Sequence, residues 1–199
     1  MAISSTKPKV LSFCRAYLVD DFRAMFAPLV DSFDVHFLCD GRNRGTDDTR
    51  ARFYANMKSG ARFTLLNGDE RIDVLTRCRL LHNLEPKRAE RMLDAMGVAL
   101  KTWFDAIQPE LVFCHMVDEY VTHLLSLIAA KRRVRYVCYA GSFFPGRLQL
   151  TTFAYGHAFD MREPDGSEID ETFATLTQKG FCRNYKQSEA YKLDGSVSV

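Results

Sequence analysis

The chain has 199 residues, of which 47% are hydrophobic and 26% are charged, and its formal net charge is +2. This composition is that of an ordinary globular protein and argues against general disorder. The small net charge gives no overall electrostatic reason to expect nucleic acid as a partner.

The first 41 residues have the pattern strand, helix, strand. Residues 9–14 (KVLSFC) and 34–39 (DVHFLC) are short apolar runs typical of buried strands. Between them, Asp20 and Asp21 precede apolar residues at helical spacing, which places two acids in the first turn of a helix. This order predicts the start of a right-handed βαβ unit.

The remainder of the chain alternates further helices and strands. Helices are predicted at about 46–58, at 69–107 with a division near Pro86, at 120–130 and at 170–179. Strands are predicted at 62–66 (RFTLL), 111–117 (LVFCHMV) and 134–140 (VRYVCYA), and a short strand or extended arm at 147–153. We therefore expect an α/β fold with a Rossmann-like, mostly parallel sheet of about five or six strands and helices on both faces. The domain is expected to span residues 1–156, and 157–199 to be a C-terminal arm or the start of an inter-domain region.

The cysteines and the N-terminal residues indicate a cellular compartment. The six cysteines include no C-x-x-C pair and no Cys/His spacing typical of zinc, so no metal site is expected. Residues 1–9 lack the apolar segment of a secretory signal, and no apolar run reaches the roughly 18 residues that a membrane-spanning helix needs. We expect reduced thiols and a cytoplasmic protein, with peripheral contact at the inner face of the membrane left open.

Ligands of open α/β sheets bind outside the carboxyl ends of the strands, and this rule selects the loops after four predicted strands. The polar candidates in these loops are Arg15, Asp20, Asp21, Arg42, Arg44, His115, Asp118, Glu119, Ser142 and Arg147. Because no G-x-G-x-x-G follows a strand and no P-loop motif is present, a dinucleotide or P-loop site has no motif to support it.

His115 stands near the end of an apolar run, and Asp118 and Glu119 open the next helix. A histidine and a carboxylate this close can act as general base and orienting partner. In the alternative, His115 is structural and Asp118 only caps the helix.

Two further segments each allow two interpretations. Residues 42–62 carry six cations and two acids interleaved with aromatic residues, which suits an anionic membrane or a diphosphate-linked lipid, or a solvated face with inward aromatics. Residues 142–156 combine phenylalanines with proline and glycine, as in a functional loop or a surface that packs on a neighbouring domain.

The opening KVLSFCRAYLVDDFRAMFAPLVDSFDVHFLCDG resembles the first strand–helix–strand of a GT-B glycosyltransferase. The segment LVFCHMVDEYVTHLLSLIAAKRRVRYVCYAGSFFPGRLQLT resembles a later part of the same half. Within it, FPGRLQLT is similar to bacterial capsular and surface-polysaccharide transferases, including Kdo-transferase-like proteins. The likeness covers about residues 8–156.

This resemblance implies the acceptor-side half of a glycosyltransferase that moves a sugar from a nucleotide-sugar co-substrate to a glycan or lipid-linked acceptor, with no other cofactor. It implies a base or acid among His115, Asp118, Glu119 and Asp20, and substrate contacts from Arg15, Ser142, Arg147, Arg42 and Arg44. A complete GT-B enzyme has a second Rossmann-like domain, which 199 residues do not supply, so we expect a further domain or a partner chain. The alternative is a non-catalytic flavodoxin-like module that docks a partner through residues 143–153.

Overall fold

The computed structural model describes residues 7–41, 47–115, 117, 119–141, 148–152 and 166–177. In these residues one sheet is formed by β1 (Lys9–Cys14), β2 (Asp34–Cys39), β3 (Asp47–Asp48), β4 (Leu111–His115), β5 (Arg135–Gly141) and β6 (Leu148–Thr151). The α-helices are α1 (Val19–Phe26), α2 (Thr49–Ser59), α3 (Gly68–Arg77), α4 (Arg79–His82), α5 (Pro86–Ile107), α6 (Tyr120–Lys131) and α7 (Gly166–Thr177). Two short 3-10 turns, Ala16–Leu18 and Ala27–Leu29, flank α1.

The strand order across the sheet is β3-β2-β1-β4-β5-β6. All neighbouring strands are parallel except β6, which returns antiparallel to β5. This is the order of a doubly wound α/β sheet, and the direction of winding reverses between β1 and β4. The expected Rossmann-like α/β fold with a mostly parallel sheet is therefore confirmed.

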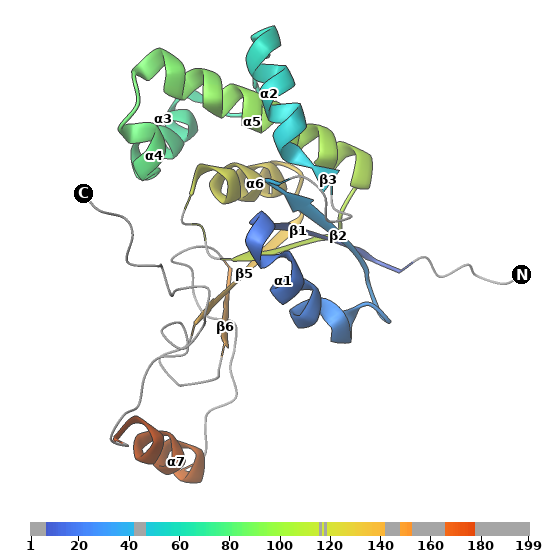
Figure 1. Ribbon diagram of the computed structural model, residues 1–199, viewed down its shortest axis with the longest axis vertical. Coiled ribbons are helices and arrows are strands. Elements are labelled where there is room, and N and C mark those ends of the chain that lie inside the picture. The colour runs from blue at the N-terminus through green and yellow to red at the C-terminus, as the bar shows by residue number, and fades with distance from the viewer. Residues whose placement is uncertain are drawn as a thin grey trace, which may run out of the picture.

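Helices cover both faces of the sheet, as expected (Figure 1). On one face α1 packs through Val19, Phe22 and Phe26 against alternate residues of the central strands. On the other face a larger core joins the strands to the helices α2 to α6. Right-handed crossovers produce this division, because the chain winds in one direction before β3 and in the other after it. The connection from β3 to β4 contains α2, α3, α4 and α5, so the α1 face is covered by fewer helices.

The starts of two helices follow their sequence signals. Asn67 caps α3 in a reciprocal capping box with Glu70, with both hydrogen bonds at 2.9 Å. Glu85 caps α5 by accepting hydrogen bonds from two backbone amides, and Pro86 occupies the first helical position. The predicted division of the helical region at Pro86 is thus confirmed.

The strand predicted at residues 62–66 is wrong, because this segment is neither strand nor helix. Its second residue, Phe63, forms hydrogen bonds with side chains instead of a neighbouring strand: its amide donates to Asp94 Oδ1 at 3.2 Å, and its carbonyl accepts from Arg71 at 3.0 Å. The Phe63 ring lies against Gly97 in the middle of α5. The third strand of the sheet is the two-residue β3, which directly precedes α2.

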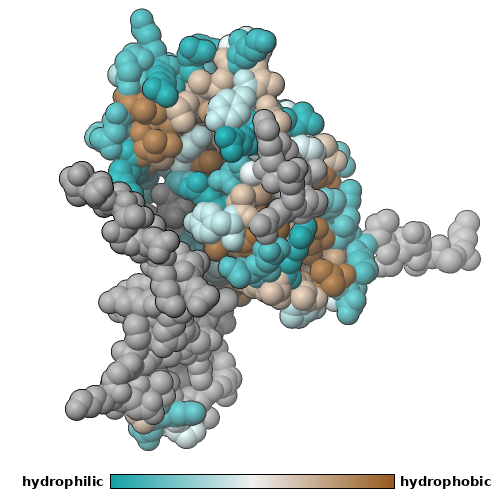
Figure 2. Space-filling view, in the orientation of Figure 1, coloured by the Kyte–Doolittle hydropathy of each residue, from teal (hydrophilic) through white to brown (hydrophobic). Residues whose placement is uncertain are grey.

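Five of the six cysteines lie in the described part of the chain, and all five are buried free thiols. Cys14, Cys39, Cys114 and Cys138 lie in apolar strands, as expected, and Cys78 lies between α3 and α4. None of the described helices is both long and apolar enough to cross a lipid bilayer. Exposed apolar side chains gather over α3 and α4 at the upper left of Figure 2, where Ile72 is 60% exposed and Leu80 54% exposed.

Candidate functional site

Three charged side chains from different loops meet where the winding of the sheet reverses. Arg15 follows the last residue of β1, Asp40 follows the last residue of β2, and Glu119 immediately precedes α6 after β4. The Arg15 guanidinium pairs with Asp40 at 3.3 Å and also forms an ion pair with Glu119. We call these three residues the switch-point trio. They occupy the carboxyl-terminal edge of the sheet, the place where open α/β proteins bind ligands.

The backbone after β1 is also bound to the Asp40 carboxylate. The Ala16 amide donates a hydrogen bond to Asp40 Oδ1 at 2.8 Å, so Asp40 bonds both a backbone and a side-chain donor of this loop. The two loops approach so closely that a methyl group on Gly41 would lie 2.3 Å from the Ala16 Cβ. A glycine at position 41 is therefore required by the close contact between the two strand ends.

The trio is partly exposed and carries a net charge of −1, from one arginine and two carboxylates. The exposed fraction of the side chain is 46% for Arg15, 34% for Asp40 and 18% for Glu119. Burial opposes the charged form of Arg15, but Glu119 and Asp40 outweigh it and raise its pKa above the usual value. The guanidinium therefore stays protonated and holds both carboxylates in place while they remain open to a ligand.

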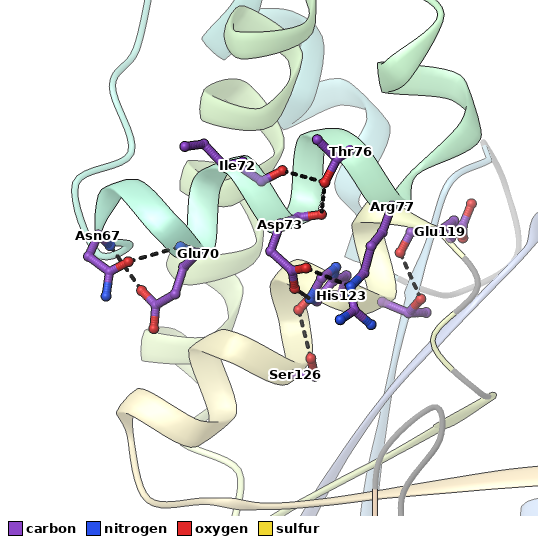
Figure 3. Close-up of polar contacts among 10 residues, drawn as sticks. Asn67, Glu70, Ile72, Asp73, Thr76, Arg77, Glu119, His123 and Ser126 are labelled. Atoms are coloured by element: carbon purple, nitrogen blue, oxygen red, sulfur yellow. Dashed lines mark hydrogen bonds and ion pairs between the residues drawn. The ribbon is translucent and has the colours of Figure 1, made fainter.

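Contacts between α3 and α6 position Glu119. Its backbone carbonyl accepts a hydrogen bond from Thr122, while its side chain makes no capping bond to α6 and is directed to Arg15 instead. One turn further along α6, the buried His123 lies 3.4 Å from Asp73 of α3, which also accepts a hydrogen bond from Arg77 at 2.6 Å (Figure 3). Burial lowers the pKa of His123, so its neutral form is favoured in this interface.

His115 occupies a different place from the trio. It ends β4 on the face that carries α1, where its exposed ring makes an edge-on contact with Tyr139 at a centroid distance of 5.3 Å. The predicted pairing of His115 with a carboxylate is not among the contacts in the described part of the chain. His115 thus lies at the end of β4, next to the end of β1 that Arg15 follows. Both ion pairs of the trio are made by Arg15.

Asp20, the other acid proposed as a base, lies in the first turn of α1 with its side chain 70% exposed. Its carboxylate lies 3.8 Å from Arg23 on the same helix. Together with Asp21 it places negative charge at the positive end of α1, where a Rossmann protein would bind a diphosphate. This start of α1 is therefore poorly suited to an anion.

Five predicted site residues lie outside the residues that the structure describes: Arg42, Arg44, Asp118, Ser142 and Arg147. Conversely, Asp40 begins one of the four loops that the strand-end rule selects, but it was not among the predicted site residues. The signal was available, because the ends of two adjacent parallel strands meet at one edge of a sheet, and Asp40 and Arg15 directly follow such strands. Opposite charges at these two positions would have predicted the ion pair.

The remaining chemistry of the described residues is limited. No group of three or more His, Cys, Asp or Glu residues in the described ranges is arranged to hold a metal ion. Cys14, beside the trio at the end of β1, is buried, and burial raises the pKa of its thiol to about 12. A thiol with this pKa is not a nucleophile near neutral pH. Hydrogen bonding and proton transfer by the carboxylates are therefore the chemistry that the trio can supply.

No protein-family model, curated protein or solved structure matches the chain.

Proposed function

We propose that this chain is the acceptor-side half of a glycosyltransferase that acts in bacterial surface-polysaccharide synthesis. The observation that carries the proposal is the pair of carboxylates, Asp40 and Glu119, that Arg15 holds at the switch point of the sheet. Carboxylates accept hydrogen bonds from hydroxyl groups and arginine donates to oxygens, so such a set can bind a sugar from several sides. The resemblance to GT-B transferases agrees with this assignment.

The electrostatics favour an acceptor over a nucleotide at this edge. A diphosphate would meet the net negative trio, the two acids of the α1 first turn and a β1 loop without glycine. A neutral sugar hydroxyl meets none of these obstacles. The nucleotide-sugar is therefore assigned to a second Rossmann-like domain or a partner chain, and the glycan or lipid-linked acceptor to this one.

In the reaction, an acceptor hydroxyl oxygen attacks the anomeric carbon of the nucleotide-sugar. The new C–O bond forms as the bond between that carbon and the phosphate oxygen breaks, and the nucleotide leaves with the bonding electrons. The hydroxyl proton passes to a base of this half. Glu119 is our first choice for the base because it lies in the trio, and His115 at the neighbouring strand end is the second. We place the transfer reaction in the cytoplasm, with peripheral contact at the membrane if the acceptor is lipid-linked.

Two measurements test the proposal. First, the fluorescently labelled chain is applied to an array of immobilised bacterial surface glycans, where we expect binding to a subset that Glu119→Gln weakens at least tenfold. Second, transfer is measured from UDP-glucose, UDP-galactose, UDP-N-acetylglucosamine and CMP-Kdo to the bound glycans, with the second domain or partner chain present. We expect Glu119→Gln to lower transfer from the active donor.

Asp105→Asn is the matched control for Glu119→Gln. Asp105 also pairs with an arginine, Arg132, at 2.6 Å, but it lies just before the amino-terminal end of β4, at the opposite edge of the sheet. Removing its charge should leave glycan binding and transfer unchanged. An array without any bound glycan, or equal losses in the two variants, would refute the proposal.

A second candidate function, a docking module, is favoured by an apolar cavity of about 300 Å³ on the α1 face of the sheet. Phe113 and Val137 of the sheet line it, together with Leu29 and Leu150, which are 36% and 40% exposed. Leu150 belongs to the segment expected to dock a partner. If docking is between copies, sedimentation velocity should show association that rises with concentration and that Leu150→Asp abolishes; a monomer at all concentrations would contradict it.

A further inference from the structure

The apolar cavity on the α1 face of the sheet has the size and the walls of a small-molecule site. Its volume of about 300 Å³ is roughly twice that of an engineered apolar cavity of about 150 Å³ that holds one benzene molecule. Every residue that lines it is apolar except one, Arg135. Ligand sites usually combine such apolar walls with a small number of polar groups that orient the ligand.

The walls include apolar side chains that a ligand can reach. β4 lies in the interior of the sheet, where strands are normally covered on both faces. Its residues Val112 and Cys114, on the other face, are fully buried, whereas Leu111 and Phe113 on the α1 face are only half-buried. Apolar area therefore stays in contact with water after α1 has packed, and an apolar ligand would be stabilised by covering it.

The aromatic part of the wall is fixed by its neighbours. The Phe113 ring makes an edge-on contact with Phe26 at a centroid distance of 5.2 Å and a stacked contact with Tyr139 at 5.7 Å. Such pairs hold aromatic rings in defined orientations. A ligand thus meets a wall that is already formed, and little free energy is lost in ordering it.

Arg135 determines the charge of the ligand. It is the first residue of β5, it is exposed, and it forms no ion pair or side-chain hydrogen bond with another residue in the described ranges. The lining of the cavity contains no acid that could neutralise it. Because a guanidinium binds carboxylate and phosphate oxygens with two parallel hydrogen bonds, the unpaired Arg135 favours an anionic group attached to an apolar chain.

We propose that this cavity binds a single alkyl chain with an anionic head group, with the chain against Leu111, Phe113 and Leu150 and the head group on Arg135. A free fatty acid and a lipid phosphate both have this chemistry. The site is separate from the switch-point trio, because Arg135 pairs in register with Leu111 at the start of β4, whereas the trio occupies the carboxyl-terminal edge of the sheet. The proposal is therefore independent of the proposed transfer reaction.

The test is isothermal titration calorimetry of the full chain with octanoate, decanoate and decyl phosphate, each below its micelle-forming concentration. We expect decanoate and decyl phosphate to bind, and octanoate to bind about tenfold more weakly than decanoate because it buries two fewer methylene groups. Decyltrimethylammonium, which has the same chain as decyl phosphate but a cationic head group, should bind at least tenfold more weakly than decyl phosphate. The tighter of the two anionic ten-carbon probes distinguishes a fatty acid from a lipid phosphate as the source.

Arg135→Gln removes the charge from an exposed position and should raise the Kd of decanoate about tenfold. The ratio between octanoate and decanoate should stay the same, because the chain contacts remain. Arg79→Gln is the matched control: Arg79 is exposed on α4, which packs through Leu81 on the other face of the sheet, so the Kd should not change. Leu150→Asp, which places a carboxylate in the lining, should abolish binding of both anionic probes.

The outcomes separate this proposal from both candidate functions. Absence of binding by decanoate and decyl phosphate, or equal losses in Arg135→Gln and Arg79→Gln, would overturn it. Self-association that Leu150→Asp abolishes and that decanoate does not reverse would also overturn it, because a second copy would then occupy the cavity. Glu119→Gln should leave the Kd of decanoate unchanged, so a failure of the glycosyltransferase assignment would not affect this result.

Discussion

Replacing Gly97 by alanine tests whether the packing of α5 is as tight as the structure indicates. A methyl group at this position would lie 2.3 Å from Cδ1, 2.5 Å from Cγ and 2.8 Å from Cε1 of Phe63. Phe63 is only 3% exposed, and its backbone is bonded on both sides, to Asp94 and to Arg71. The ring therefore has little room to move, and the clash must be relieved by shifting the segment or the helix.

The two contributions to the change in stability have opposite signs. Helix propensity alone would make Gly97→Ala stabilising by about 1 kcal/mol. Overpacking of a core costs roughly 1–3 kcal/mol, and a fully displaced phenylalanine about 3–5 kcal/mol. Because the contacts are with ring atoms well below van der Waals distance, we expect overpacking to prevail, with a net loss of about 2 kcal/mol. For a chain of this size this corresponds to a fall in Tm of roughly 4–8 °C.

The assay is thermal and urea unfolding followed by circular dichroism, with Gly68→Ala as the matched control. Gly68 is likewise in a helix, as the first residue of α3, but a methyl group there would meet nothing within 4 Å, so the control should be neutral or slightly stabilising. In the double variant Gly97→Ala/Phe63→Leu the two losses should be less than additive, because the smaller side chain relieves the clash. A Gly97→Ala protein as stable as the wild type, or more stable, would refute the reasoning.

Three other predictions follow from the same structure. Gly41→Ala should lower stability by about 1–2 kcal/mol, since the added methyl meets Ala16, and should weaken glycan binding on the array. Thr49→Val should leave Tm unchanged or raise it, by up to about 1 kcal/mol of unfolding free energy, because it removes a buried hydroxyl without a partner. The pKa of His123 is lowered by burial and only partly restored by Asp73, so the unfolded chain binds the proton more tightly and stability should fall as pH drops below about 6.5. Urea unfolding at several pH values should show that His123→Gln loses less free energy of unfolding than the wild type as the pH falls. The same dependence of that free energy on pH in both proteins would contradict the prediction.

The sheet could be predicted largely from the sequence because its central strands carry strong local signals. β1 and β2 were predicted at their observed bounds, since each is a six-residue apolar run bordered by polar or turn residues. Right-handed crossover then defines the side on which α1 lies. The third strand could not be predicted, because β3 consists of two aspartates, which have low strand propensity. The apolar run at 62–66 resembles a strand, but the buried Asp94 and the half-buried Arg71 provide the backbone partners of Phe63 from 31 and 8 residues away.

The site was predictable only in part, because its contacts join residues that are far apart in the sequence. Arg15 and Glu119 were expected at strand ends, but their ion pair spans 104 residues and depends on the order in which the strands assemble. The apolar cavity brings together residues of β1, α1, β4, β5 and β6, and no local pattern predicts that α1 leaves this part of the sheet open. An unpaired buried hydroxyl such as that of Thr49 becomes apparent only when every neighbouring donor and acceptor has been placed.

The position of Glu119 also depends on residues that no site prediction would select. Glu119 lies at the start of α6, and α6 is bound to α3 at two places. His123 contacts Asp73 near the start of α6 (Figure 3). Lys131 pairs with Glu70 at 2.7 Å near its end. Two contacts about two turns apart on α6 restrict rotation as well as translation of the helix. The carboxylate is therefore held toward Arg15 by the packing of α3, and a substitution at Asp73 should alter the trio even though Asp73 does not touch it. This makes α3, an element without any site residue, part of the structure that positions the proposed base.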